Sequence, residues 1–407
     1  MFFLDSALFQ QSQLQIFDPP QIPEYIEVYT GQPADIRAVA AQFFNDIHQW
    51  MPIISKRRFY HQLLNPLSPR RADFVMVIIA MRLITWSPSE LTAEPRSPMY
   101  LAAKRYCAET EMTGNITITF LQATIFIAIY EFGHAIYPAA YLSIGSCARY
   151  GAALGLNNDG KGSGRPPPDD WVELEEMRRV WWGVLILDCL VNLGNPLRML
   201  ATEEPKSEHP LPVDDTTWDN GNTIPENDLT LSSCSSLEMG RFARFAQATA
   251  LLGKVLRHIC DDIIDESLYD EEGVQLQRTL SSLVNLSFIE GQARNLEFCT
   301  QTATCYSAIL ALHQPEVTAA NLKYRSAANN SENTPEAVSR RTAIIVQSFQ
   351  PRGHIPVSIV SPFCLHLIYQ AALIFTRGTQ LTETSDKMSL LEQLKWGLSI
   401  LSSKWKA

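Results

Sequence analysis

One segment in the middle of the chain, residues 170–196, constrains its fold more than any other, because it contains residues that indicate both the start and the end of a long helix. Asp170 can cap the start, and Glu173 can complete a capping box. Gly194 can accept a left-handed turn and Pro196 cannot continue a helix, so the helix is expected to end there. The spacing predicts about 22 helical residues, roughly 33 Å in length. Apolar residues occupy every side from Trp181 onward, which predicts a helix that is buried all round.

The charged residues of this predicted helix need partners. Asp188 lies within its apolar stripe, where a carboxylate is costly unless it is paired. Arg178 is too far along the helix axis, so we expect a partner from another helix and choose Arg149. We interpret that buried pair as structural, fixing helix register, rather than as a ligand contact. Glu175 and Arg179 are in an i, i+4 arrangement and are expected to pair on the helix surface.

The adjacent tryptophans of the same helix cannot share a face. Trp181 and Trp182 point about 100° apart. We therefore expect them to pack as core against two different neighbouring helices, and not to form a cofactor cage.

Composition limits the class of protein. The chain has 407 residues, of which 46% are hydrophobic, so it can bury the core of one large or two smaller units. Its N-terminus has no basic start and is a poor secretory signal. The longest apolar stretch, residues 116–130, falls short of the ~20 residues of a membrane span and is predicted to be a buried helix. An intracellular, soluble protein is expected.

The cysteines and the net charge argue against two further classes. The eight cysteines are scattered and no Cys-x-x-Cys occurs, so neither a disulfide framework nor a thiolate zinc site is predicted. The formal net charge is −10, whereas duplex binding depends on cationic side chains that displace phosphate counterions. We therefore expect no specific DNA binding by this chain alone, and no cofactor.

Helical patterns dominate the sequence, and no convincing run of alternating strand residues occurs. The predicted fold class is all-α, a large multi-helix bundle. A polar, proline-punctuated arm (1–34) is expected to precede a helical domain (35–260) and a C-terminal helical region (261–407), within which 318–341 is expected to be a mobile linker. Helices are predicted over residues 74–83, 99–112, 236–265, 273–314, 362–376 and 389–404.

Four blocks of the sequence resemble, in the same order, the regulatory ("middle homology") domain of fungal zinc-cluster transcription factors. Residues 43–60 resemble its opening Phe-His-Pro-Ile segment, and residues 140–159 resemble its helix that ends in Leu-Gly-Leu. Asn195 departs from the family, which usually has arginine at that place. The two remaining blocks supply Arg178, Arg179, Trp181, Trp182, Asp188, Gly194 and Pro196, then Pro212, Asp214 and Asp215 before Trp218.

The resemblance implies a helical regulatory domain of a nuclear transcription factor, which is not an enzyme. Such a domain controls activation by binding a small-molecule effector or a partner protein. The family's DNA-binding element is an N-terminal cluster of six cysteines that holds two zinc ions, and nothing upstream of the matching region fits it. The implied protein therefore reaches DNA through a partner or a missing N-terminal segment, and no membrane partner is expected.

A metal-dependent enzyme is the alternative hypothesis. Asp261, Asp262 and Asp265 follow the Asp-Asp-x-x-Asp pattern with which helical isoprenoid cyclases hold magnesium. Those enzymes need a second metal-binding motif downstream, which we do not find in the sequence. The simpler interpretation is an acidic helix end, at which the helix is expected to break because carboxylates oppose the dipole of a helix C-terminus. A purely structural or scaffold role is a third possibility.

Overall fold

The structure is a computed structural model in which two compact units are distinguished. They are Met1–Leu187 with Ser207–Ser233, and Asp188–Lys206 with Cys234–Ala407. This division differs from the predicted boundary between residues 260 and 261. The structure describes residues 22–65, 71–88, 94–114, 116–158, 170–221, 229–233, 239–261, 265–294, 300–313, 334–377 and 385–406. Within these ranges the secondary structure is helical apart from two isolated bridges, which confirms the all-α prediction.

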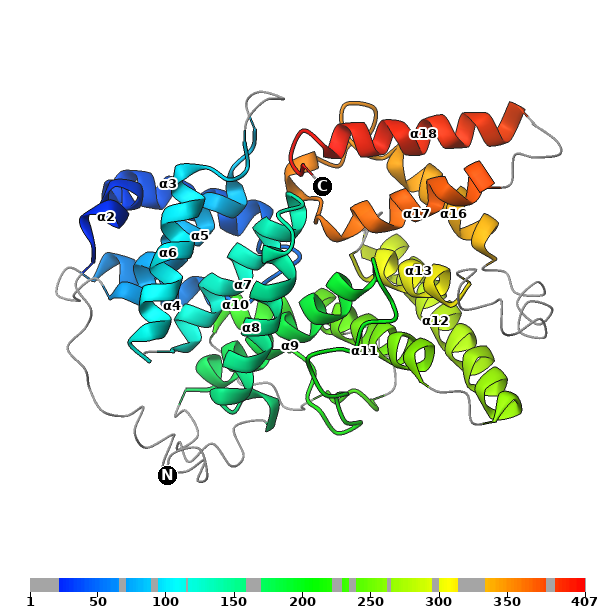
Figure 1. Cartoon of the computed structure of the whole chain (residues 1–407), viewed down its shortest axis with the longest axis horizontal. Helices are drawn as coiled ribbons and strands as arrows, with labels where there is room; N and C mark the ends of the chain where they lie inside the picture. The colour runs from blue at the N-terminus through cyan, green and yellow to red at the C-terminus, as the bar shows by residue number, and fades with distance from the viewer. Residues whose placement is uncertain are drawn as a thin grey trace. The chain divides into compact units, whose positions relative to one another are not determined.

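The first unit is built around two nearly all-buried helices, α5 (Ala72–Thr85) and α7 (Ile118–Gly133), which pack on each other (Figure 1). The apolar run predicted as a buried helix is α7, so that prediction is confirmed. Side-chain oxygens of Ser55, Ser97 and Thr117 cap the starts of α4, α6 and α7. The other helices are α2 (Glu24–Thr30), α3 (Pro33–Asp46), α4 (Lys56–Leu64), α6 (Pro98–Met112), α8 (Ala139–Ala153), α10 (Asp215–Asn220) and the part of α9 (Trp171–Asn192) that ends at Leu187.

The second unit continues from the last turn of α9. Its helix α11 (Arg241–Cys260) packs on α12 (Glu266–Arg294) and α13 (Thr300–Leu312). Helix α17 (Phe363–Arg377) packs on α13, and also on α16 (Pro335–Val346) and α18 (Ser385–Leu401) (Figure 1). Near the C-terminus, Trp405 is fully buried in this unit, and its indole N–H donates to the carbonyl of Val360 at 3.0 Å.

Three predicted segments differ from the structure. The single helix expected over 273–314 is two helices, α12 and α13, and α12 starts at Glu266. The expected linker 318–341 is wrong in its last part, because α16 begins at Pro335; residues 318–333 lie outside the described residues. The expected arm 1–34 contains α2 and the start of α3, and Ile26 of α2 is fully buried.

No helix among the described residues is long and apolar enough to cross a membrane.

Two glycines of α8 offer a matched test of the packing in the first unit. A Cβ added at Gly151 would lie 2.8 Å from the ring of Trp181, whereas nothing lies within 4 Å of one added at Gly145. Trp181 is buried and cannot move aside, so Gly151→Ala is expected to destabilise the unit by about 1–3 kcal/mol. Gly145→Ala is expected to be neutral or to stabilise it by about 0.5–1 kcal/mol. Thermal unfolding of both variants measures the difference, and equal shifts would contradict this packing.

Candidate functional site: a buried arginine network

Helix α9 carries most of the site, and it forms as the sequence predicts. It spans Trp171–Asn192, which is 22 residues, and the Asp170 carboxylate accepts the amide of Val172 at 3.0 Å. Glu173, expected in a capping box, lies 3.1 Å from the guanidinium of Arg58. Gly194 is not in the left-handed conformation expected of it, and the chain instead turns with the Asn195 amide donating to Asn192.

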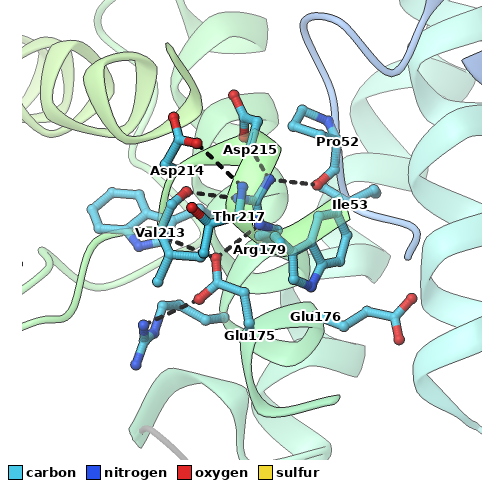
Figure 2. A network of polar contacts seen from close by, with 12 residues as sticks. Pro52, Ile53, Glu175, Glu176, Arg179, Val213, Asp214, Asp215 and Thr217 are labelled. Atoms are coloured by element: carbon cyan, nitrogen blue, oxygen red, sulfur yellow. Dashed lines mark hydrogen bonds and ion pairs between the residues drawn. The ribbon is translucent and has the colours of Figure 1, made fainter. Parts of the chain in front are cut away.

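The guanidinium of Arg179 is fully buried and donates in four directions (Figure 2). Its Nε lies 2.8 Å from Glu175 of the same helix, and its Nη1 lies 2.7 Å from Asp215. Nη1 also donates to the carbonyl of Pro52 at 3.3 Å, and Nη2 to that of Val213 at 2.7 Å. One side chain therefore ties α9 to the segment before α4 and to the segment that begins α10.

Glu175 completes the same junction from the acidic side. Its Oε1 also accepts the Val213 amide at 2.9 Å, and its Oε2 lies 3.1 Å from Arg178. The predicted pairing of Glu175 with Arg179 is confirmed, but its predicted place on the helix surface is wrong. The two side chains are 2% and 0% exposed, because the segment 211–218 covers them.

An aromatic layer covers one face of the guanidinium. The Arg179 Cζ lies 4.1 Å from the ring centroid of Trp218, a cation–π distance. The Trp218 indole N–H donates to the carbonyl of Val172 at 3.3 Å, which holds the ring against α9. His48 stacks on Trp218 at 6.1 Å, and its Nε2 lies 3.1 Å from Asp219.

A second carboxylate of α9 binds another part of the unit. Oε1 of Glu176 accepts the Ser55 amide at 2.8 Å and the Gln122 amide group at 3.0 Å, while Oε2 lies 2.7 Å from Arg58. Gln122 also donates to the carbonyl of Ile53 at 2.6 Å. A glutamine that merely interrupts an apolar run in the sequence thus links α7 to α9 and to the segment before α4.

Burial and charge act in opposite directions on these groups. Burial lowers the pKa of Arg179, but the carboxylates of Asp215 and Glu175 more than offset it and raise the pKa above its ordinary value. Burial raises the pKa of Glu175, and the two guanidiniums and the Val213 amide oppose that rise. Because the guanidinium is held in its charged form and the Glu175 carboxylate accepts from Arg179, Arg178 and the Val213 amide, the network is suited to rigid support rather than to proton transfer.

The remaining motif residues of the first unit lie around this network. The buried Trp181 lies against Gly151 of α8, as predicted for a neighbouring helix. Trp182 is fully buried, but its N–H donates at 2.9 Å to Pro210, in a non-helical segment. Pro212 lies between Leu211 and Val213 in the segment that covers α9, and Asp214 caps α10 by accepting the amides of Thr216 and Thr217.

Asp188 belongs to the second unit and has a partner that the sequence did not reveal. Its Oδ2 accepts the amide and the hydroxyl of Thr202 at 2.8 and 2.7 Å, and Arg257 donates to the carbonyl of Thr202 at 3.1 Å. The side chain is buried, as expected, but the choice of Arg149 is wrong, because Arg149 is exposed and Thr202 takes its place. Burial raises the pKa of Asp188, against the lowering effect of these donors. Pro196 is buried as well, and its carbonyl accepts the thiol of Cys260.

The acidic cluster of the alternative hypothesis is divided by the helix end expected there. Helix α11 ends at Cys260 and Asp261 is extended. Asp265 accepts the amides of Ser267 and Leu268 at the start of α12. Asp262 lies outside the described residues. Among those that are described, no group of three or more potential ligands could hold a metal ion.

All four blocks of the sequence resemblance therefore meet on α9, and the comparison with known families agrees with them. The family described as "Fungal specific transcription factor domain" matches residues 40–293, more than half of the chain. The chain belongs to this family. It is accordingly a transcription regulator and not an enzyme, so the cyclase alternative is set aside.

Three relatives among known proteins carry related names. Transcription factor BOA15 of Botryotinia fuckeliana is 38% identical over 145 residues, which are 36% of this chain and 80% of that protein. Transcription factor tazR of Aspergillus terreus is 27% identical over 166 residues, 40% of this chain and 26% of that protein. Tropolone cluster transcription factor tropK of Talaromyces stipitatus is 26% identical over 211 residues, 49% of this chain and 36% of that protein. The chain thus covers well under half of the latter two. No solved structure matches the chain.

Proposed function

We propose that this chain is the regulatory domain through which a nuclear transcription factor receives a signal from a small-molecule effector or a partner protein. The observation that carries the proposal is the Arg179 network, on which blocks that resemble the fungal regulatory domain converge. In this proposal the network holds the segments of the domain in place, because its charged groups are buried and are paired with one another. Recognition of the signal is then left to other surfaces.

The genes under control are proposed to form a biosynthetic cluster. The support is the printed name of tropK, which assigns that relative to a tropolone cluster. Contact with DNA is proposed to pass through a partner or through a further segment of the protein. The net charge of −10 supports this, because it disfavours close approach of this domain to phosphate.

Deletion of the gene, followed by transcript profiling, tests the proposed function. We expect the transcripts of a contiguous group of genes to fall or rise together, and a fluorescent fusion to collect in the nucleus. Re-expression of the wild-type chain should restore the pattern. Re-expression of the Arg179→Leu variant should not restore the pattern, because that change removes the buried guanidinium at the centre of the network. Transcripts that remain unchanged after deletion would contradict the proposal.

A further inference from the structure

Helix α2 precedes the region that the family matches and packs on α5 and α6 of the first unit (Figure 1). Its seven residues are too few for a helix that is stable alone in water, and no side chain caps its start. Its buried residues are Ile26 and Thr30, whereas in α5 every residue except Arg82 is buried. Helix α2 is therefore folded only because it is docked, and it is docked through a small part of its surface.

The polar contacts that dock α2 lie close to solvent. The hydroxyl of Tyr25 donates to Glu109 of α6 at 2.5 Å, and the guanidinium of Arg105 lies 4.3 Å from the centroid of the Tyr25 ring. At the other end of α2, Arg82 of α5 donates to the carbonyl of Thr30 at 3.1 Å. The side chains of Arg105 and Glu109 are 66% and 38% exposed, so water can replace their contacts with Tyr25 when α2 leaves.

The docked state also leaves two buried polar atoms near α2 unsatisfied. Nε of Arg82 and the hydroxyl of Tyr106 are shielded from water, and neither has a hydrogen-bond partner among the described residues. Arg82 contacts α2 directly, and Tyr106 lies beside the bond between Tyr25 and Glu109. Burial raises the pKa of Tyr106 to about 12, and the charges of Asp73 and Glu109 add to that rise. A buried donor without a partner is costly, so the docked state carries a cost that water can remove.

A glycine joins α2 to α3. Gly31 has φ 76° and ψ 179°, a conformation that is essentially restricted to glycine, and a Cβ there would lie 2.3 Å from Nη2 of Arg82. The start of α3 is capped independently of α2, because the carboxylate of Asp35 accepts the Gln32 amide at 3.0 Å. Helix α3 can therefore keep its start while the backbone at Gly31 changes.

We propose that α2 is a releasable strap, which exchanges between the docked state of this structure and a released state. Release turns the chain at Gly31, lets water reach Arg82 and Tyr106, and opens the surface of α5 and α6 that α2 covers. A surface that is open in only one of two states is what a switch requires, because a ligand that binds the open state shifts the equilibrium. The proposal concerns the first unit and does not depend on the effector or on the target genes.

Hydrogen–deuterium exchange of the full chain, followed by mass spectrometry, tests the strap. In the wild-type chain we expect the amides of α2 to exchange at least about a hundredfold faster than those of α7, after correction for their intrinsic rates. Gly31→Ala should speed exchange in α2 at least about tenfold and leave α7 unchanged, because the strained backbone and the contact with Arg82 disfavour docking. Tyr106→Phe should slow exchange in α2 at least about threefold, because it removes the unsatisfied hydroxyl from the docked state.

Three tyrosines supply matched controls. Tyr100→Phe removes a hydroxyl of α6 that donates to Glu131 at 2.8 Å, and it should not slow exchange in α2. Tyr25→Phe loses the bond to Glu109 and should speed exchange in α2. Tyr29→Phe removes a hydroxyl of α2 that bonds to none of the described residues of α5 and α6, and it should have no effect. Wild-type α2 amides that exchange as slowly as those of α7 would overturn the proposal. It would also be overturned if Tyr106→Phe left exchange in α2 unchanged or made it faster.

Discussion

Replacing Arg179 by leucine is expected to lower the free energy of unfolding of the first unit by about 3–5 kcal/mol. The guanidinium is fully buried and is shared by the carboxylates of Glu175 and Asp215. Leucine fills part of its volume but leaves the Glu175 charge buried with less compensation. It also deprives the carbonyl of Val213 of its donor. Chemical denaturation followed by tryptophan fluorescence measures the loss.

Two further variants show whether burial and geometry cause that loss. Arg105→Leu breaks an i, i+4 pair with Glu109 whose side chains are 66% and 38% exposed, so it is expected to lower the free energy of unfolding far less than Arg179→Leu. Arg179→Lys keeps the charge, but a single ammonium cannot reach the partners that the planar fork joins, so an intermediate loss is expected. If Arg179→Leu costs no more than Arg105→Leu, the network does not stabilise the unit.

The sequence predicts α9 well because its information is local. A capping residue at the start, a glycine and proline after the end, and apolar residues on all sides together specify a long buried helix. The same local rule identifies Arg179 as the partner of Glu175. Local spacing cannot show that the Glu175 and Arg179 side chains are buried, because the segment 211–218 that covers them is distant in sequence and has no helical period.

The partner of Asp188 could not be predicted for a related reason. Burial of its carboxylate follows from the apolar stripe, and that part of the prediction is correct. Its donors, however, are the amide and hydroxyl of Thr202, in an irregular polar segment after the helix. Helical periodicity in the sequence indicates only partners on regular helices, and a charged residue such as Arg149 is the obvious choice among them. A neutral threonine in a loop can also supply two hydrogen bonds to a carboxylate, one from its hydroxyl and one from its backbone amide.

The sequence contains a start signal for helix α16, but the polar composition around it favours a linker. The polar composition of residues 318–341 favours a linker, yet Thr334 followed by Pro335 is a typical helix start. In the structure Thr334 accepts the amide of Ala337 and Pro335 occupies the first turn. The buried residues of this helix include Val338, Thr342 and Val346, a helical spacing that the surrounding polar residues obscure.

Replacing Trp182 by alanine is the second change with a large expected effect, about 3–5 kcal/mol. The side chain is fully buried, and its N–H bond to Pro210 ties the segment that covers α9 to the helix itself. Trp182→Phe keeps most of the volume and loses that bond, so a smaller cost of about 1–2 kcal/mol is expected. Trp86→Ala, at a half-buried tryptophan of the same unit, is the control and is expected to cost about 1–2 kcal/mol. Chemical denaturation of the three variants separates volume from hydrogen bonding. Equal losses for Trp182→Ala and Trp182→Phe would assign the effect to the bond, whereas a loss for Trp182→Ala no larger than that for Trp86→Ala would contradict the role of Trp182 as core.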